Sequence, residues 1–322
     1  MSDSLKTNNH RIILAAADLG VRKVRIPVAM ITGEKPGRTL IITAGSDGDE
    51  YAGIEAAYRL IELYKNNKFR GRLIIFPVLN IPGFENRSGV NPLDNKYPKH
   101  IYPGNIKGSP TERLIYWLDT NYIKNADFWL DLHGGATDEK LDPFIFFYET
   151  GNEKLNILMK SLIMATSAKK IVFLKKNICQ KAEILAGQNI GYVMAEAGCL
   201  GRRDKASISK HLEWTKRIMG VLGMIGIRKN KNIHSKVYRK IVEYRTDRAG
   251  IWIPAEIKNK NIFKNQKIGE IRSLAGDHLK DVVSTVDGEY LWSKYGMICR
   301  ENETLFCIGY EGLELKDMGG KL

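Results

Sequence analysis

The stretch that decides the fold is residues 38–64, which reads RTLIITAGSDGDEYAGIEAAYRLIELY. Its first seven residues, 38–44, are mostly β-branched or aliphatic and predict a short buried strand. A glycine-containing turn follows at once over residues 45–50. Apolar residues at helical spacing then predict a helix over residues 52–64. A strand, a tight turn and a helix in direct succession are typical of an α/β layer.

The same order of elements continues through residue 227. It predicts a mostly parallel, mixed sheet with helices on both faces. The further strands are expected at residues 72–79, 126–132, 144–148, 170–174 and 191–195, and the further helices at residues 111–118, 154–168 and about 207–226.

A different pattern begins near residue 228, where short strands alternate with glycine turns and no helix is predicted. Strands are expected at residues 237–245, 250–257, 265–272, 281–292 and 304–311. The sequence therefore predicts two domains, an α/β catalytic domain over residues 1–227 and a C-terminal β-domain over residues 228–322.

Composition excludes several classes of protein. The chain has 322 residues, of which 43% are hydrophobic, so it is not largely disordered. Its apolar runs fall short of the ~18 residues that span a bilayer, and the polar first twenty residues do not resemble a secretory signal. We therefore expect a cytoplasmic protein without a membrane partner. The four cysteines form no C-x-x-C pair, so neither a zinc knuckle nor a disulfide framework is predicted.

The excess of basic residues invites a nucleic-acid interpretation, since 50 Lys and Arg stand against 36 Asp and Glu. The excess is uneven, because residues 228–272 hold 13 basic and 4 acidic side chains, a net +9. No basic stretch is interleaved with aromatic residues in the manner of a base-stacking surface. We therefore expect no nucleic-acid partner. The positive charge could instead draw a small anionic substrate toward a cleft, and a homo-oligomer is left open.

Ionisable residues follow three of the predicted strands. Asp47 and Glu50 lie in the turn after residues 38–44, His133 ends the strand at 126–132, and Glu196 ends the strand at 191–195. The carboxyl ends of parallel strands meet at one edge of a sheet, so these side chains should converge on one cleft. Asp47, Glu50 and His133 would form a three-ligand site with an open fourth position, as in catalytic zinc sites. Glu196 would then be the general base that takes a proton from water.

The order of these motifs resembles the succinylglutamate desuccinylase/aspartoacylase family of the zinc carboxypeptidase superfamily. The resemblance covers roughly residues 10–312. It rests on Gly48-Asp49-Glu50, Asp131-Leu132-His133, Glu196-Ala197-Gly198, the segment from Asn80 to Gly104, and three C-terminal motifs, Ala249-Gly250-Ile251, Asn265 to Gly269 and Val286-Asp287-Gly288. It implies a zinc-carboxypeptidase-like α/β domain with a small barrel-sandwich-like β-domain behind it. Asp131, two residues before His133, would either orient the metal site or serve as a simple turn cap.

The resemblance also assigns substrate-binding roles, with two departures at functional positions. Arg87 matches the family's arginine that stabilises the oxyanion. Asp47 stands where the family has its first zinc-ligand histidine. Pro98-Lys99-His100 stands where the family has the Leu-Asn-Arg that binds the substrate's carboxylate. Lys99 would replace that arginine as a point charge, and His100 is either part of this site or an unrelated surface residue.

The carboxylate of Asp47 changes the expected chemistry of the metal. Two anionic ligands, Asp47 and Glu50, would cancel the charge of a divalent ion and make it a poorer Lewis acid. Zn²⁺ is expected, with Mn²⁺ or Fe²⁺ as harder alternatives. Purely structural interpretations also exist. Asp47 would then serve the turn, Glu50 would be a first-turn acid of the helix, and His133 would cap its strand.

The sequence thus predicts a metal-dependent amidohydrolase that removes an acetyl- or succinyl-type group from an N-acyl amino acid or a similar small, carboxylate-bearing amide. Two alternatives remain open: a metallocarboxypeptidase-like enzyme that acts on peptides, and a catalytically inactive family member that serves as a binding or scaffold protein.

Overall fold

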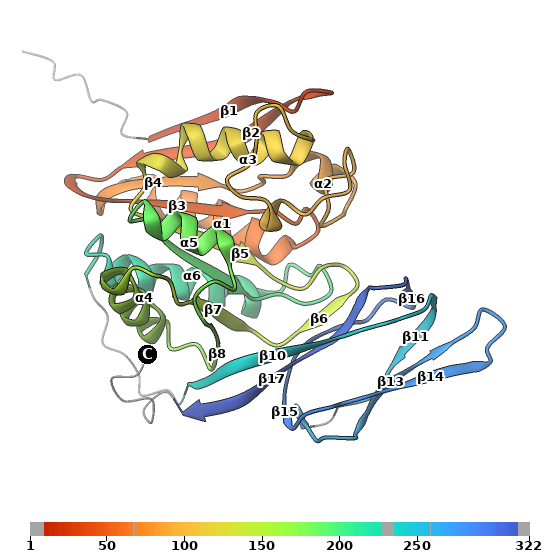
Figure 1. Cartoon of the computed structure of the whole chain (residues 1–322). Helices are drawn as coiled ribbons and strands as arrows, with labels where there is room; N and C mark the ends of the chain where they lie inside the picture. Colours follow the sequence, from red (N-terminus) through yellow and green to blue (C-terminus); the bar gives the residue numbers. More distant parts are fainter. Residues whose placement is uncertain (1–9, 67, 227–234, 258, 315–322) are drawn as a thin grey trace, which may run out of the picture.

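The computed structural model describes residues 10–66, 68–226, 235–257 and 259–314 (Figure 1). Up to residue 226 the elements are β1 (His10–Asp18), β2 (Lys23–Thr32), β3 (Lys35–Ala44), α1 (Tyr51–Tyr64), β4 (Arg70–Phe76), α2 (Ile81–Glu85), η1 (Pro98–His100), α3 (Pro110–Asn121), η2 (Ile123–Asn125), β5 (Phe128–His133), β6 (Glu139–Leu141), β7 (Phe144–Tyr148), α4 (Glu153–Thr166), β8 (Lys170–Leu174), α5 (Gln180–Gly187), β9 (Gly191–Glu196) and α6 (Lys205–Val221). Then follow β10 (Lys236–Arg245), β11 (Gly250–Pro254), β12 (Asn261–Ile262), β13 (Lys267–Arg272), β14 (His278–Val283), β15 (Gly288–Lys294), β16 (Ile298–Cys299) and β17 (Thr304–Glu314).

One long mixed sheet organises the molecule. Its strand order is β1-β2-β4-β3-β5-β9-β7-β8-β10-β17-β15-β12, with β6 paired to β15. The middle of this sheet is parallel, because β5 pairs in parallel with both β3 and β9. The carboxyl ends of β3, β5 and β9 therefore lie at the same edge of the sheet.

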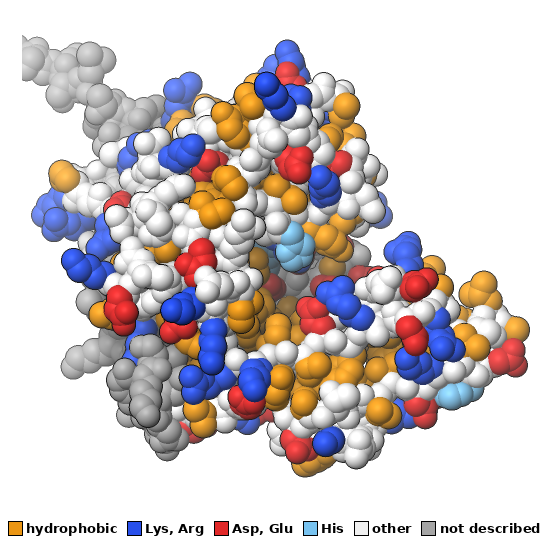
Figure 2. All heavy atoms as spheres, viewed as in Figure 1, with side chains coloured by type: hydrophobic (Ala, Val, Ile, Leu, Met, Phe, Trp, Pro, Cys, Tyr) orange, Lys and Arg blue, Asp and Glu red, His pale blue; other side chains and the backbone are white. Residues whose placement is uncertain are grey.

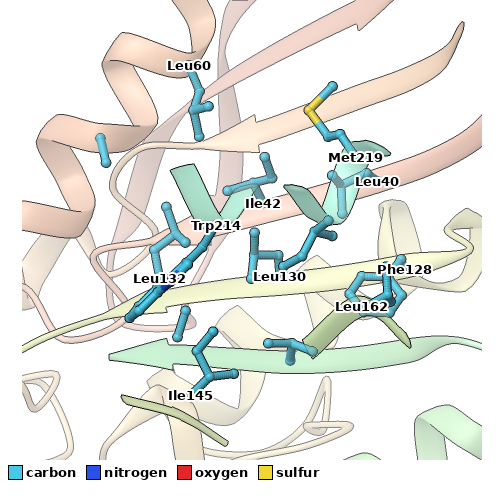
Figure 3. Close-up of a cluster of buried hydrophobic side chains, with 14 of the residues drawn as sticks. Leu40, Ile42, Leu60, Phe128, Leu130, Leu132, Ile145, Leu162, Trp214 and Met219 are labelled. Carbon is cyan, nitrogen blue, oxygen red and sulfur yellow. The ribbon is translucent and has the colours of Figure 1, made fainter. Parts of the chain in front are cut away.

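Both faces of the α/β part are covered by helices, as predicted. Successive side chains of β5 point to opposite faces of the sheet. Leu130 and Leu132 point into a core shared with α1, α4 and α6 (Figure 3). Trp129 packs on the other face against side chains of α3 and α5. Fully burying one such leucine contributes about 1.5–3 kcal/mol, so the two cores hold the strands in a fixed register.

The C-terminal strands continue the long sheet and add a small second one. β10 pairs in parallel with β8, with Lys236 opposite Lys170, and β17, β15 and β12 follow. A separate sheet of order β14-β13-β11-β16 buries Trp252. The predicted domain boundary between residues 227 and 228 lies outside the described residues. The continuity of the sheet was not predicted, because pairing between distant strands leaves no local signal in a sequence.

Most predicted elements are confirmed within a few residues of their bounds. Three differences stand out. The hairpin of β1 and β2 at the sheet edge was missed, although β2 carries the strand-favouring residues Val24, Ile26 and Val28 at alternate positions. The short helix α5 was also missed, since eight residues show little periodicity. The single strand predicted at residues 281–292 is divided between β14 and β15. Among the described helices, none is long and apolar enough to cross a membrane.

Candidate active site

The strand ends bring the predicted site residues together, as the parallel order requires. Residues at the ends of β5 and β9 lie directly opposite each other, with His133 paired to Glu196. Thr43 of β3 lies opposite Asp131 of β5. The turn after β3 therefore projects Asp47 and Glu50 over the end of β5.

Close packing fixes the shape of this turn. A Cβ on Gly48 would lie 2.1 Å from the backbone nitrogen of Phe84, so only glycine fits there. The Gly48 N–H donates to the carbonyl of Ser88 at 3.0 Å, and the Asn80 side chain donates to the carbonyl of Ser46 at 3.2 Å. The turn is thus anchored to the segment after β4, in which α2 lies.

Asp47, Glu50 and His133 form one buried group. One ligand atom from each lies within 4.8 Å of the others. His133 Nδ1 lies 2.9 Å from Glu50 Oε2, which also accepts the Gly134 N–H at 3.0 Å. The structure thus brings together all three residues that the sequence predicts as ligands.

Asp131 lies behind His133 and faces its other ring nitrogen. His133 Nε2 is 3.2 Å from Asp131 Oδ2, a distance that suits an ion pair without the alignment of a hydrogen bond. The Thr43 hydroxyl donates to Asp131 Oδ1 at 2.6 Å, and the Tyr192 hydroxyl donates to Oδ2 at 3.2 Å. Burial alone would raise the pKa of Asp131, but His133, Lys181 and the Thr43 hydrogen bond lower it below its ordinary value. Asp131 is therefore an anion that can orient the imidazole.

Lys181 of α5 is a buried cation of this site that the sequence analysis missed. Its Nζ lies 4.0 Å from Asp131 Oδ2 and within 5 Å of the centres of the Trp129 and Tyr192 rings, at 4.9 and 4.8 Å. Burial lowers the pKa of Lys181, while Asp131 raises it. No sequence motif marked this lysine, because it lies in the helix that was not predicted.

Lys99, which lies in η1, contacts the carboxylate of Asp47. Its Nζ lies 2.5 Å from Asp47 Oδ2 and 5.1 Å from the centre of the Tyr97 ring. The other oxygen, Asp47 Oδ1, is buried and has no hydrogen-bond partner among the described residues. Lys99, predicted to bind a substrate carboxylate, is therefore paired with a carboxylate of the protein.

His100 and Arg87 are the remaining residues with a predicted role toward the substrate. His100 packs edge-on against Tyr97, with ring centres 5.7 Å apart. Desolvation of its ring and the charge of Lys99 lower the pKa of His100 to about 4, so the imidazole is neutral at pH 7. Arg87 follows α2 and is exposed, with a backbone φ of +52°. Its guanidinium has no hydrogen-bond or ion-pair partner in the described part of the chain. Its oxyanion role stays a prediction.

Glu196 is the carboxylate placed to exchange a proton. It is 8% exposed, and burial raises its pKa to about 7, against the opposing charges of His133 and Lys99. No hydrogen bond or ion pair joins its carboxylate to another of the described residues. Glu139 of β6 is a partly buried carboxylate that acts electrostatically on Lys99, and its pKa is also raised by desolvation. The sequence analysis missed it because no motif includes it.

An apolar strip adjoins Glu196. Phe144 lies opposite Glu196 in the pairing of β7 with β9, and the Phe144 and Phe146 rings lie 5.1 Å apart. Figure 2 shows a hollow between the α/β part and the C-terminal strands, with hydrophobic side chains gathered along it. One buried apolar cluster includes Phe144 of β7 and Leu291 of β15, and the partly buried residues packed against it are Leu141, Phe146, Leu174, Ile241 and Trp292.

The donor set fits a divalent metal ion. It offers one imidazole nitrogen and two carboxylates, an acceptable combination for zinc and for harder ions. The buried, unpartnered Asp47 Oδ1 is an orphaned acceptor of the kind that a cation satisfies. Asp47, Glu50 and His133 would hold the ion, and Asp131 would orient His133.

Such a group of carboxylates and histidine at the strand ends of an α/β sheet is typical of metal-dependent hydrolases. Residues 36–222 match the family model of the succinylglutamate desuccinylase/aspartoacylase catalytic domain. The chain therefore belongs to the succinylglutamate desuccinylase/aspartoacylase family and carries its catalytic domain. The predicted family and fold class are both confirmed.

Relatives and solved structures agree with this assignment. The chain is 34% identical over 122 residues to N-alpha-acetyl-L-2,4-diaminobutyric acid deacetylase of Halomonas elongata; the aligned part covers 38% of this chain and 35% of the relative. A succinylglutamate desuccinylase of Silicibacter sp. superposes with a TM-score of 0.82 at 17% identity, covering 96% of this chain and 98% of its own. The product-bound ectoine utilization protein EutE of Ruegeria pomeroyi also gives a TM-score of 0.82 at 17% identity, covering 96% and 97%. At this identity the two structures show a shared fold.

Proposed function

We propose that this protein is a metal-dependent amidohydrolase that removes a small acyl group from an N-acyl amino acid or a related small amide. The observation that carries the proposal is the convergence of Asp47, Glu50 and His133 on one buried group, with Glu196 opposite His133 in the next strand. The partial match to an N-acetyl-diaminobutyrate deacetylase supports an N-acyl amino acid as the substrate class.

The chain's own residues provide the parts that amide hydrolysis needs. A divalent metal bound by Asp47, Glu50 and His133, with Zn²⁺ expected, would supply Lewis acidity and an acidified water. Glu196 would accept the proton of the attacking water and later deliver it to the leaving amine. A pKa of about 7 suits both halves of this transfer, because the carboxyl exchanges its proton readily near neutral pH.

The surroundings of Glu196 support a substrate with an apolar portion. Phe144 and Phe146 lie on the same side of the sheet as Glu196, and Phe146 packs against the buried apolar cluster to which Phe144 belongs. Burial of an acyl methyl or methylene group there would contribute about 0.8 kcal/mol per carbon. Arg87 is the proposed oxyanion contact, reached when its exposed side chain turns inward.

The test is acyl release from a panel of N-acetyl and N-succinyl amino acids by protein purified without chelators, followed by amine detection. We expect hydrolysis of at least one member, lost in Glu196→Gln. Cleavage of peptides without cleavage of acyl amino acids would favour the metallocarboxypeptidase alternative. No hydrolysis of either, together with the appearance of activity in Asp47→His, would favour a natural binding protein.

A further inference from the structure

We propose that Lys99 is a built-in counter-ion of the metal-binding group, which offsets the extra negative charge that Asp47 brings to it. The inference rests on the proposed metal site. It assigns Lys99 a role toward the protein's own carboxylate instead of a substrate's carboxylate.

Lys99 contacts only one of the two carboxylate oxygens of Asp47. Lys99 Nζ lies 2.5 Å from Oδ2, whereas the buried Oδ1 has no hydrogen-bond partner among the described residues. A metal ion and the ammonium group can therefore use different oxygens of one carboxylate. Neither has to displace the other.

The surroundings of Lys99 hold it in this position. Its side chain is only 23% exposed, and its Nζ lies over the Tyr97 ring at 5.1 Å from the centre. A Cβ on Gly89 would lie 2.9 Å from the Tyr97 ring and 3.3 Å from Asp47 Oδ2. The absence of a side chain at Gly89 is thus what lets the Tyr97 ring and the Asp47 carboxylate approach each other.

The other charges near Lys99 are mostly negative. Besides Asp47, the carboxylates of Glu50, Glu196 and Glu139 act on it electrostatically. Lys181 lies instead 4.0 Å from Asp131, which faces the other ring nitrogen of His133. His100, the next residue, is neutral at pH 7. Lys99 is therefore the ammonium group that faces Asp47.

Lys99 changes the net charge of the metal-binding group. Asp47 and Glu50 carry −1 each and a ligating His133 is neutral, so the three ligands sum to −2 and would cancel a divalent ion. With Lys99 the sum is −1, and the loaded site keeps a net charge of +1. A positive centre is a stronger Lewis acid but binds its metal less tightly, so Lys99 weakens metal affinity while it maintains electrophilicity.

The experiment measures Zn²⁺ affinity by competition with a chromophoric chelator, without any substrate. The variants are Lys99→Met, the charge-preserving Lys99→Arg, Asp47→His and the double variant Asp47→His/Lys99→Met. Lys96→Met is the matched control, because Lys96 lies in the same loop but pairs with Glu112 at 3.2 Å, away from Asp47. Circular dichroism of each variant checks the fold.

We expect Lys99→Met to bind Zn²⁺ about tenfold more tightly than the natural protein, since a cation beside the metal is removed. Asp47→His should bind more weakly, because its neutral ligand leaves Lys99 uncompensated. The double variant should recover an affinity within about threefold of the natural protein. Lys99→Arg and Lys96→Met should stay near the natural value.

Unchanged or weaker Zn²⁺ binding by Lys99→Met overturns the proposal, as does an Asp47→His effect that is equal with and without Lys99. If Lys99→Met does not fold, the Zn²⁺ affinities of Lys99→Arg and Lys99→Gln are compared instead. Tighter binding by Lys99→Gln supports the proposal, and equal or weaker binding overturns it. Absence of Zn²⁺ binding in all variants also overturns it. Because no substrate is used, a failure of the proposed function appears separately, as missing acyl release with the metal coupling intact.

Discussion

His133 and Glu196 lie directly opposite each other at the ends of the neighbouring parallel strands β5 and β9. Paired residues in a sheet project to the same face, so the predicted metal ligand and the predicted base share one side of the cleft. The pairing of β5 with β9 thereby fixes the position of Glu196 relative to His133, independently of the conformation of the surrounding loops.

This relationship predicts the effect of Glu196→Gln. The substitution keeps size and hydrogen-bonding capacity but removes the basic oxygen, so kcat should fall by about 10²–10⁴-fold. Hydrolysis of the best acyl amino acid is the measurement, with Zn²⁺ affinity as the control. A variant that keeps more than a tenth of the natural kcat would contradict the role of Glu196.

The raised pKa of Glu196 predicts a pH dependence. Burial raises this pKa to about 7, and only the ionised form accepts a proton, so kcat/KM should rise with pH and level off above about 7. A bound metal cation would move the rise toward lower pH. The pH profile of kcat/KM tests this, and a rate that increases as pH falls from 7 would be incompatible with a carboxylate base.

Lys181 should matter for stability through Asp131. Replacing it with methionine preserves contact with the Trp129 and Tyr192 rings but removes the buried ammonium group that faces Asp131. The free energy of unfolding should fall by about 3 kcal/mol. Urea denaturation measures it, with Lys240→Met as control: Lys240 is 53% exposed and paired with Glu311, so its loss should cost much less than the loss of Lys181. Equal losses in the two variants would argue against a buried ion pair at Asp131.

The turn that carries Asp47 should not tolerate a side chain at Gly48. Gly48→Ala would place a methyl group 2.1 Å from the Phe84 nitrogen, so the turn must move and the three ligands must separate. We expect Zn²⁺ affinity to fall at least tenfold. Gly187→Ala in α5 is the control, because its new methyl group meets no atom within 4 Å. Natural affinity in Gly48→Ala would show that the ligands do not depend on this packing.

The core beneath the site predicts a further stability effect. Leu130 is fully buried among side chains of the sheet and helices (Figure 3), and Leu130→Ala should reduce the free energy of unfolding by about 2–5 kcal/mol. Leu63 of α1 is 50% exposed, so Leu63→Ala should cost far less. Urea denaturation of both variants gives the comparison, and equal costs would contradict the assigned core.

The candidate site could be predicted from the sequence because three hydrophobic runs are followed by the ionisable residues Asp47, His133 and Glu196. Parallel order then required these three to share an edge, and the structure agrees. The pairing of Lys99 with Asp47 could not be predicted, because the two residues are 52 positions apart and Lys99 lies in an irregular loop. The same holds for Lys181, whose helix is too short for its periodicity to be clear.

The central claim is that Asp47, Glu50 and His133 hold a divalent metal ion. Elemental mass spectrometry of protein purified without chelators tests it most directly, with the natural chain compared with His133→Ala. The account predicts about one divalent ion per natural chain and a large loss in the variant. A natural protein without a bound divalent ion, or equal metal content in His133→Ala, would contradict it.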